Sequence, residues 1–172
     1  MPTPRRPSRL RLSPDVRPTA YDVHLAPDLE TGRFEGEVRI TVQLTRARAA
    51  VALHAADLKI GEAVAEIGGN VVAARAALRR ADEVVILRFA QRLPAGQATL
   101  RLRFAGALNE HLRGFYSARA DGRRYAFTQC EAADARRILP CFDEPSFKAR
   151  FRLAVTVAEG NVVVSNSPVE RE

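Results

Sequence analysis

The chain has 172 residues, of which 47% are hydrophobic and 27% are charged, and it carries a formal net charge of +7. This length and composition are typical of one globular domain with a core of useful size, and they exclude disordered, collagen-like, coiled-coil and disulfide-rich proteins. The sequence contains no apolar run of about 18 residues, so no membrane-spanning helix is expected.

Residues 1–12 are predicted to form a flexible tail, because three prolines stand among Arg and Ser and disfavour regular structure. The tail has no apolar stretch among its basic residues, which argues against a secretory signal. We therefore expect a cytoplasmic protein in which Cys130 and Cys141 are reduced thiols. Residues 13–172 show no internal repeat or linker and are expected to form one domain.

Alternation of apolar and polar residues, the pattern of a half-buried strand, dominates the sequence after this tail. It is clearest at residues 38–44, where Val, Ile, Val and Leu alternate with Arg, Thr and Gln. The Ala-rich segment 47–56 also has its larger apolar residues at strand spacing, so a strand is predicted there. Residues 71–78 are similarly rich in Ala, a composition that imitates a helix.

Two hairpins are predicted from apolar runs that flank turn residues. Residues 84–89 and 100–104 lie on either side of Leu-Pro-Ala-Gly-Gln at 93–97. Near the C-terminus, residues 151–157 and 162–164 flank Glu-Gly-Asn in the same way. Both pairs are expected to be antiparallel.

Helical signals are few. Only residues 132–139 are predicted to form a helix, a short one that Pro140 ends. Many short strands with a turn about every ten residues indicate an all-β protein, built as an antiparallel sandwich or barrel.

Sequence motifs of catalysis are absent. The three histidines are scattered, and none forms HExxH or pairs with another histidine four residues away, so the chain lacks the ligand set of a zinc peptidase. There is no GxSxG, P-loop or GxGxxG motif, and neither cysteine has a histidine close to it in the sequence. The chain by itself therefore offers no complete active site and no metal site.

The positive charge has two explanations. Only Lys59 and Lys148 among the 27 basic residues are lysine, so the charge reflects a general use of arginine. A nucleic-acid site gathers its cations on one surface. Here the arginines are spread along the chain, and many alternate with apolar residues as on a solvated strand face, which makes nucleic-acid binding the less favoured explanation.

One segment, residues 125–149, departs from the strand pattern. Its blocks are Thr-Gln-Cys-Glu at 128–131, Asp-Ala-Arg-Arg at 134–137 and Pro-Cys-Phe-Asp-Glu-Pro-x-x-Lys-Ala at 140–149. Together they closely resemble the N-terminal domain of the M1 zinc aminopeptidases, the group of aminopeptidase N and leukotriene A4 hydrolase. Further matching blocks extend the resemblance to residues 12–172.

The resemblance implies a fold and a role. The expected fold is an all-β, antiparallel, saddle-like β-sandwich with one short helix, missing its last strands. Glu131 would grip the free α-amino group of a peptide substrate, and Gln129 would line the space for the first side chain. Zinc and its ligands would belong to a thermolysin-like catalytic domain, supplied in cis or in trans, so the chain alone is predicted to be inactive. A truncated sandwich should also expose an unpaired edge and an apolar face.

The other charged residues of this segment are expected to be architectural. Arginines and carboxylates this close in sequence can satisfy one another and the backbone of a loop, and the two cysteines are expected to pack as small hydrophobes. This group of structural residues comprises Asp134, Arg136, Arg137, Asp143, Glu144 and Lys148.

Two alternatives to the substrate-anchoring domain stay open. The first is a non-catalytic, aminopeptidase-like protein-interaction module, and the second is a basic nucleic-acid binder. Glu131 argues against the first, because a module freed from peptide chemistry has no need of an intact Gln-x-Glu. The same residue favours aminopeptidases over the epoxide hydrolase branch, which tends to carry Gln there.

Overall fold

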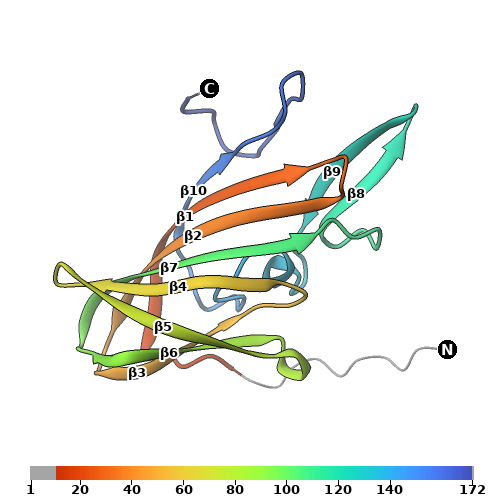
Figure 1. Ribbon diagram of the computed structural model, residues 1–172. Helices are drawn as coiled ribbons and strands as arrows, with labels where there is room; N and C mark the ends of the chain where they lie inside the picture. The colour runs from red at the N-terminus through yellow and green to blue at the C-terminus, as the bar shows by residue number, and fades with distance from the viewer. Residues whose placement is uncertain (1–10, 172) are drawn as a thin grey trace.

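The structure, a computed structural model, describes residues 11–171 (Figure 1). Most of the predicted tail, residues 1–10, therefore lies outside the described residues. The end of that segment belongs to the folded domain, because Leu12 is only 4% exposed and its backbone N–H donates a 2.7 Å hydrogen bond to Glu144 Oε1.

The protein is built almost entirely from strands, as predicted. Eight strands form one curled sheet in the order β10-β1-β2-β7-β4-β5-β6-β3, and β8 and β9 form a separate hairpin. All pairs are antiparallel except β1 with β10. The elements are β1 (Val16–Asp28), β2 (Arg33–Leu44), β3 (Arg48–His54), β4 (Lys59–Ile67), β5 (Asn70–Arg79), η1 (Arg80–Asp82), β6 (Val84–Leu93), β7 (Gly96–Ala107), β8 (Gly114–Ala120), β9 (Arg123–Gln129), η2 (Ala135–Arg137) and β10 (Arg150–Val155).

The core lies inside the curl of the sheet. Alternate residues of β2 point inward, and Val38, Ile40 and Val42 have no exposed surface. They pair in register with the inward residues of β7, so that Val38 lies opposite Leu102 and Ile40 opposite Leu100. The period-2 pattern thus correctly predicted both strands, and both Ala-rich segments are also strands, β3 and β5.

The first predicted hairpin is wrong. Strands β6 and β7 both form, but β6 pairs with β5 and β3, whereas β7 pairs with β2 and β4. Because the sheet curls, the two strands contribute Leu87 and Leu100 to one core from separate positions in the sheet. Apolar alternation identifies each strand, but it does not identify the neighbouring strand.

The second predicted hairpin is wrong as well. Residues 162–164 form no strand, and β10 instead pairs in parallel with β1, with Phe151 stacked on Tyr21 at 4.5 Å between ring centroids. Strand β10 is an edge of the sheet, and Phe151 and Leu153 are 65% and 50% exposed. The sheet is therefore open at β10, and this edge strand carries two exposed apolar side chains.

The predicted helix at 132–139 shortens to the three-residue 3-10 turn η2. Two interactions, rather than the hydrogen bonds of a longer helix, fix the conformation of this segment. The Asp134 carboxylate accepts from Arg137, and after η2 the backbone of Cys141 forms a β-bridge with His54 that draws the chain into an extended path. Within residues 11–171, no helix has the length and apolar character needed to cross a membrane.

Candidate functional site

Residues 125–149, which carry the family motifs and are called the resemblance segment below, lie where the β8–β9 hairpin meets the body of the domain. Gln129, the last residue of β9, lies opposite Gly114, the first residue of β8. The chain then turns back through exposed residues 130–133, and the turn is closed by a 2.8 Å hydrogen bond from the Asp134 N–H to the Cys130 carbonyl. Glu131 sits in this turn, directly after the strand end.

Gly114 allows η2 to lie directly against the hairpin. Its φ is +61°, in the left-handed region that favours glycine, and a Cβ at this position would lie 2.6 Å from the Cβ of Arg137. The absence of a side chain at position 114 therefore lets Arg137 approach the strand pair that ends at Gln129.

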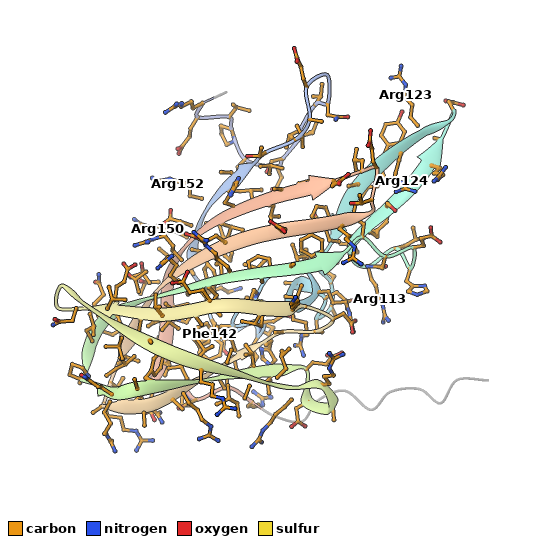
Figure 2. All side chains as sticks on the ribbon, in the orientation of Figure 1. Arg113, Arg123, Arg124, Phe142, Arg150 and Arg152 are labelled. Carbon is orange, nitrogen blue, oxygen red and sulfur yellow. The ribbon has the colours of Figure 1, made fainter. Side chains whose placement is uncertain are left out.

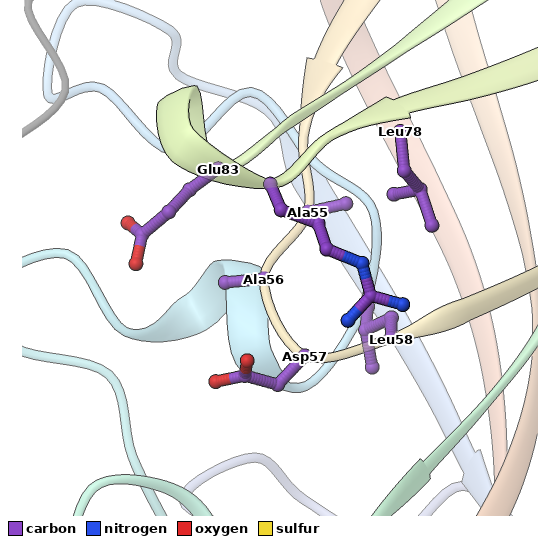
Figure 3. A pocket seen from close by; sticks show the side chains of 7 residues that line it. Ala55, Ala56, Asp57, Leu58, Leu78 and Glu83 are labelled. Atoms are coloured by element: carbon purple, nitrogen blue, oxygen red, sulfur yellow. The ribbon is translucent and has the colours of Figure 1, made fainter.

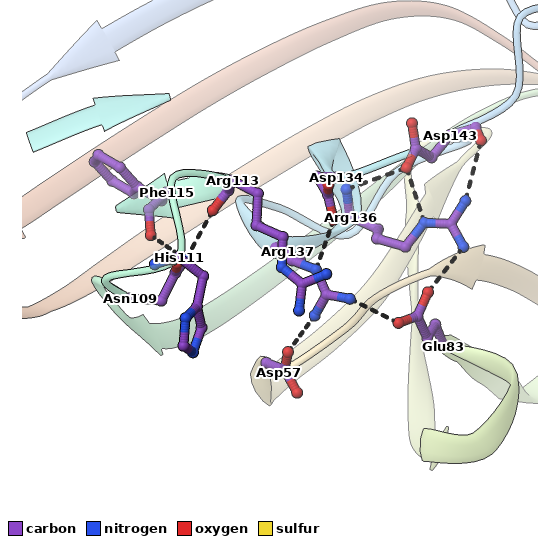
Figure 4. A network of polar contacts seen from close by, with 10 residues as sticks. All are labelled: Asp57, Glu83, Asn109, His111, Arg113, Phe115, Asp134, Arg136, Arg137 and Asp143. Atoms are coloured by element: carbon purple, nitrogen blue, oxygen red, sulfur yellow. Dashed lines mark hydrogen bonds and ion pairs between the residues drawn. The ribbon is translucent and has the colours of Figure 1, made fainter. Parts of the chain in front are cut away.

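Arg137 stands at the centre of a network of ion pairs (Figure 4). Its side chain is only 10% exposed, and it donates to Asp134 at 2.7 Å, to Glu83 at 2.8 Å and to Asp57. Burial lowers the pKa of Arg137, but the Asp134 hydrogen bond and the charges of Glu83 and Asp57 outweigh it, so the pKa is raised and the guanidinium stays charged.

Arg136 completes this network from the other side of η2. It is 8% exposed, and it binds Asp143 Oδ2 at 2.8 Å and the second oxygen of Glu83 at 3.3 Å. The two guanidinium groups therefore share one glutamate, and the charge of each is balanced by neighbouring carboxylates.

Side chains from two distant strands accept hydrogen bonds from the backbone of the Pro-bracketed loop at 140–145. The Tyr21 hydroxyl accepts the N–H of Phe142 at 3.0 Å, and burial raises the pKa of that tyrosine well above 10. His54 Nδ1 accepts the N–H of Asp143 at 3.2 Å. A loop tied to two core strands in this way forms a rigid support for η2.

Five of the six residues expected to be architectural form ion pairs or hydrogen bonds within the domain, and the sixth is Lys148. Asp134, Arg136, Arg137 and Asp143 form the network, and Glu144 accepts the Leu12 N–H. Lys148 is exposed and makes no ion pair with any residue from 11 to 171.

The two cysteines behave differently from one another. Cys141 is buried, as predicted, but Cys130 is exposed, so packing as a small hydrophobe is wrong for it. The reason is that Cys130 lies in the exposed turn after β9, between Gln129 and Glu131, rather than beneath the sheet. Partial burial of the thiol and the nearby charges of Asp143, Asp134 and Glu131 raise the pKa of Cys130.

Glu131 and Gln129 are both exposed. Neither makes a side-chain hydrogen bond or ion pair with any residue of the described part of the chain, although two arginines lie only five and six positions after Glu131. Those arginines are held by Asp57, Glu83, Asp134 and Asp143. The Glu131 carboxylate is therefore left free to accept hydrogen bonds from a ligand.

Sequence reasoning missed the two carboxylates that come from elsewhere. Asp57 and Glu83 lie 80 and 54 residues before Arg137, and no local pattern links them to it. Both have positive φ, at 58° and 54°, in connections between strands.

A cavity of about 60 Å³ lies beside Asp57 and Glu83 (Figure 3). This space is enough for a few water molecules and too small for a peptide. The cavity therefore does not compete with the turn at Glu131 as a substrate site. Its lining consists of Ala55, Ala56, Asp57, Leu58, Leu78, Arg80 and Glu83.

The chain resembles known proteins over nearly its whole length. The family model described as the Peptidase M1 N-terminal domain matches residues 17–172. The chain is 38% identical to Aminopeptidase M1-D of Oryza sativa subsp. japonica and 35% identical to Aminopeptidase M1 of Arabidopsis thaliana, in each case over 94% of its own length. It covers 19% and 20% of those two relatives. Aminopeptidase N of Acetobacter pasteurianus is 32% identical over 92% of the chain and 45% of the relative.

Proposed function

Because the chain belongs to the M1 peptidases, in which it corresponds to the N-terminal domain, we propose that it anchors the amino end of a peptide substrate. Glu131 binds the free α-ammonium group, and Gln129 lines the space for the first side chain. The observation that carries this proposal is the contrast at η2, where the arginines are held by carboxylates and Glu131 is exposed without a side-chain partner among residues 11–171.

The chemistry of the anchor follows from the positive charge of the substrate's α-ammonium group and the negative charge of the Glu131 carboxylate. A peptide α-amino group has a pKa of about 7.7–8.0, so it is mostly protonated at neutral pH. A carboxylate accepts a charge-assisted hydrogen bond from it, which is stronger than a hydrogen bond between neutral groups. Holding the terminus at Glu131 places the first peptide bond at a fixed distance from it, which favours removal of one residue from the end of a peptide over cleavage inside it.

In this proposal the zinc of the family is held outside this domain. Within residues 11–171, no three side chains of His, Cys, Asp or Glu are grouped so as to hold a metal ion. The metal ligands and the hydrolytic chemistry belong, in this proposal, to the region that the longer relatives carry beyond the matched segment, and the chain alone does not hydrolyse peptides.

A chimera tests the anchor directly. This chain replaces the matched segment of rice Aminopeptidase M1-D, and kcat/KM is measured on an aminoacyl-p-nitroanilide for the chimera with Glu131 and with Glu131→Gln. We expect a loss of about 10- to 100-fold in kcat/KM, the size of one hydrogen bond to a charged group. Glu159→Gln, at another exposed glutamate, is the matched control and should leave kcat/KM unchanged.

If the chimera is active and Glu131→Gln leaves its kcat/KM unchanged, the anchoring role is contradicted and a non-catalytic interaction module is favoured. Zinc-dependent cleavage of the same substrate by the isolated chain would contradict the assignment of the chemistry to another region.

A further inference from the structure

Two pairs of arginines lie directly opposite one another on neighbouring strands of the large sheet. Arg39 of β2 lies opposite Arg101 of β7, and Arg75 of β5 lies opposite Arg88 of β6. Side chains at opposed positions point to the same face with their Cβ atoms about 4.5–5.5 Å apart, so two like charges there destabilise the strand pair. The two arginine pairs differ in whether the protein supplies a counter-charge.

The first pair is neutralised by carboxylates from the adjacent strand β4. Glu66 binds Arg39 at 2.7 Å and lies 3.6 Å from Arg101. Glu62 lies 3.4 Å from Arg101 as well. The two opposed guanidinium groups therefore share one glutamate, which a third extended segment brings to them, and this pair is satisfied within the domain.

The second pair has no such carboxylate. Arg75 and Arg88 are exposed, and neither makes an ion pair or a side-chain hydrogen bond with any residue from 11 to 171. The same is true of Arg79, which follows Arg75 by four residues and therefore points to the same face of β5. We call Arg75, Arg79 and Arg88 the arginine face.

The neighbouring strands cannot neutralise the arginine face. Strands β5, β6 and β3 are adjacent in the sheet, and they contain no Asp or Glu. On the other side of β5, the pairing with β4 ends at Ala73, before Arg75, and both glutamates of β4 are bound to the first arginine pair. A counter-charge for the arginine face must therefore come from outside residues 11–171.

Small side chains surround the arginine face. Arg88 lies opposite Ala50 of β3 as well as Arg75, and in the next row Ala77 lies opposite Ile86. Alanine leaves the guanidinium groups accessible above a flat surface. Figure 2 shows β5 and β6 at the lower end of the molecule, away from the hairpin that carries the labelled Arg123 and Arg124.

We propose that the arginine face binds an acidic segment of a polypeptide partner, whose carboxylates bind the second arginine pair as Glu66 binds the first. A guanidinium donates two parallel hydrogen bonds to a carboxylate, which suits this contact. Arg75 and Arg79 are about 14 Å apart along the strand, so acidic residues four positions apart in an extended peptide match their spacing. The proposal is independent of the anchoring role of Glu131, because no residue of the arginine face belongs to the resemblance segment.

Two other anionic partners match this surface less well. Sites for single-stranded nucleic acid stack the bases on exposed aromatic rings. The one aromatic residue of β3, β5 and β6 is Phe89, which is 9% exposed and belongs to the core. Membrane surfaces are bound by large apolar side chains that enter the lipid beside basic residues, whereas Ala50 and Ala77 stand beside these arginines.

Fluorescence anisotropy tests the proposal on the chain itself. The probe is a short fluorescein-labelled peptide in which Glu alternates with Thr, and its amino end is acetylated so that it offers no α-ammonium group to Glu131. We expect the double variant Arg75→Gln/Arg88→Gln to bind the probe about tenfold more weakly, the sum of two exposed ion pairs. The matched control is Arg119→Gln/Arg123→Gln, which removes the same charge from exposed positions of the hairpin and should leave the affinity unchanged.

A second variant supplies the missing carboxylate from within. Arg88→Glu places an acid opposite Arg75, so it should abolish binding of the probe and raise the urea midpoint of unfolding. The chain with Glu131→Gln should bind the probe like the unaltered chain, so failure of the anchor and failure of the arginine face give different results.

Three outcomes would overturn the proposal. The first is that the unaltered chain does not bind the probe, and the second is that the two double variants weaken binding equally, which would make net charge its only cause. The third is that duplex DNA or phosphatidylserine vesicles bind more tightly than the peptide and lose that binding in Arg75→Gln/Arg88→Gln, which would assign the face to phosphate groups.

Discussion

The two halves of the resemblance segment differ sharply in their environment. Residues 129–133 are all exposed, whereas residues 136–142 are buried except for Arg137, whose side chain is 10% exposed. In the second half the charged side chains form ion pairs within the protein, whereas in the first half Glu131 has no side-chain partner among residues 11–171. The difference shows that one part of a charged motif can form a rigid support through internal ion pairs, while the other part is held exposed at the surface by that support.

Removal of Arg137 should break the supporting half most severely. Arg137→Ala leaves Asp57, Glu83 and Asp134 without the cation that they share, and losing one partner of a buried ion pair costs about 3–5 kcal/mol. We expect a loss of about 3 kcal/mol in the free energy of unfolding, measured by urea denaturation.

Glu131→Gln provides the comparison within the same segment, because an exposed side chain with no partner in the described part of the chain should change stability by less than about 0.5 kcal/mol. A loss at Glu131 as large as that at Arg137 would show that both halves are structural.

A second variant separates backbone strain from the contact with η2. Gly114→Ala places a Cβ against Arg137 and forces alanine into the left-handed region, which together should cost about 2–3 kcal/mol. Gly122→Ala has a similar φ of +74° but open space around it, so only the strain of about 1 kcal/mol should appear. Equal melting temperatures for the two variants would show that the approach of η2 to the hairpin adds nothing.

High pH should loosen the loop that supports η2. Burial raises the pKa of Tyr21 above its usual value of 10, so above pH 10 the unfolded chain loses a proton that the folded protein keeps. Stability therefore falls with rising pH in this range, by about 1 kcal/mol per pH unit from this group. Tyr21→Phe should reduce the slope of stability against pH between 10 and 11, and an unchanged slope would show that Tyr21 does not contribute to it.

The smallest effect concerns the two thiols, one in each half of the segment. In the folded chain, Cys130 is exposed and should react with a thiol reagent, although slowly at neutral pH because its pKa is raised. Cys141 is buried with a pKa raised well above 9, and it should react only after unfolding. Equal rates under native conditions, followed by absorbance, would contradict the difference in burial.

Much of this architecture is visible in the sequence. The alternation in β2 and β7 predicts which residues enter the core, because the side-chain period of a strand is a local property. The blocks from Thr128 to Ala149 likewise predict the family and the place of Glu131 at the end of a strand. Local patterns could not show that β6 and β7 separate or that β10 joins β1 in parallel, since strand partners depend on how the whole sheet curls.

The sequence by itself thus determined that this is an all-β domain of the M1 type and that Glu131 stands within its Gln-x-Glu motif. Only the tertiary structure decided which charges are used internally. Asp57 and Glu83 reach Arg137 from 80 and 54 residues away. The physical reason is that ion pairing and exposure are set by distances in space, and those distances follow from folding the distant strands together.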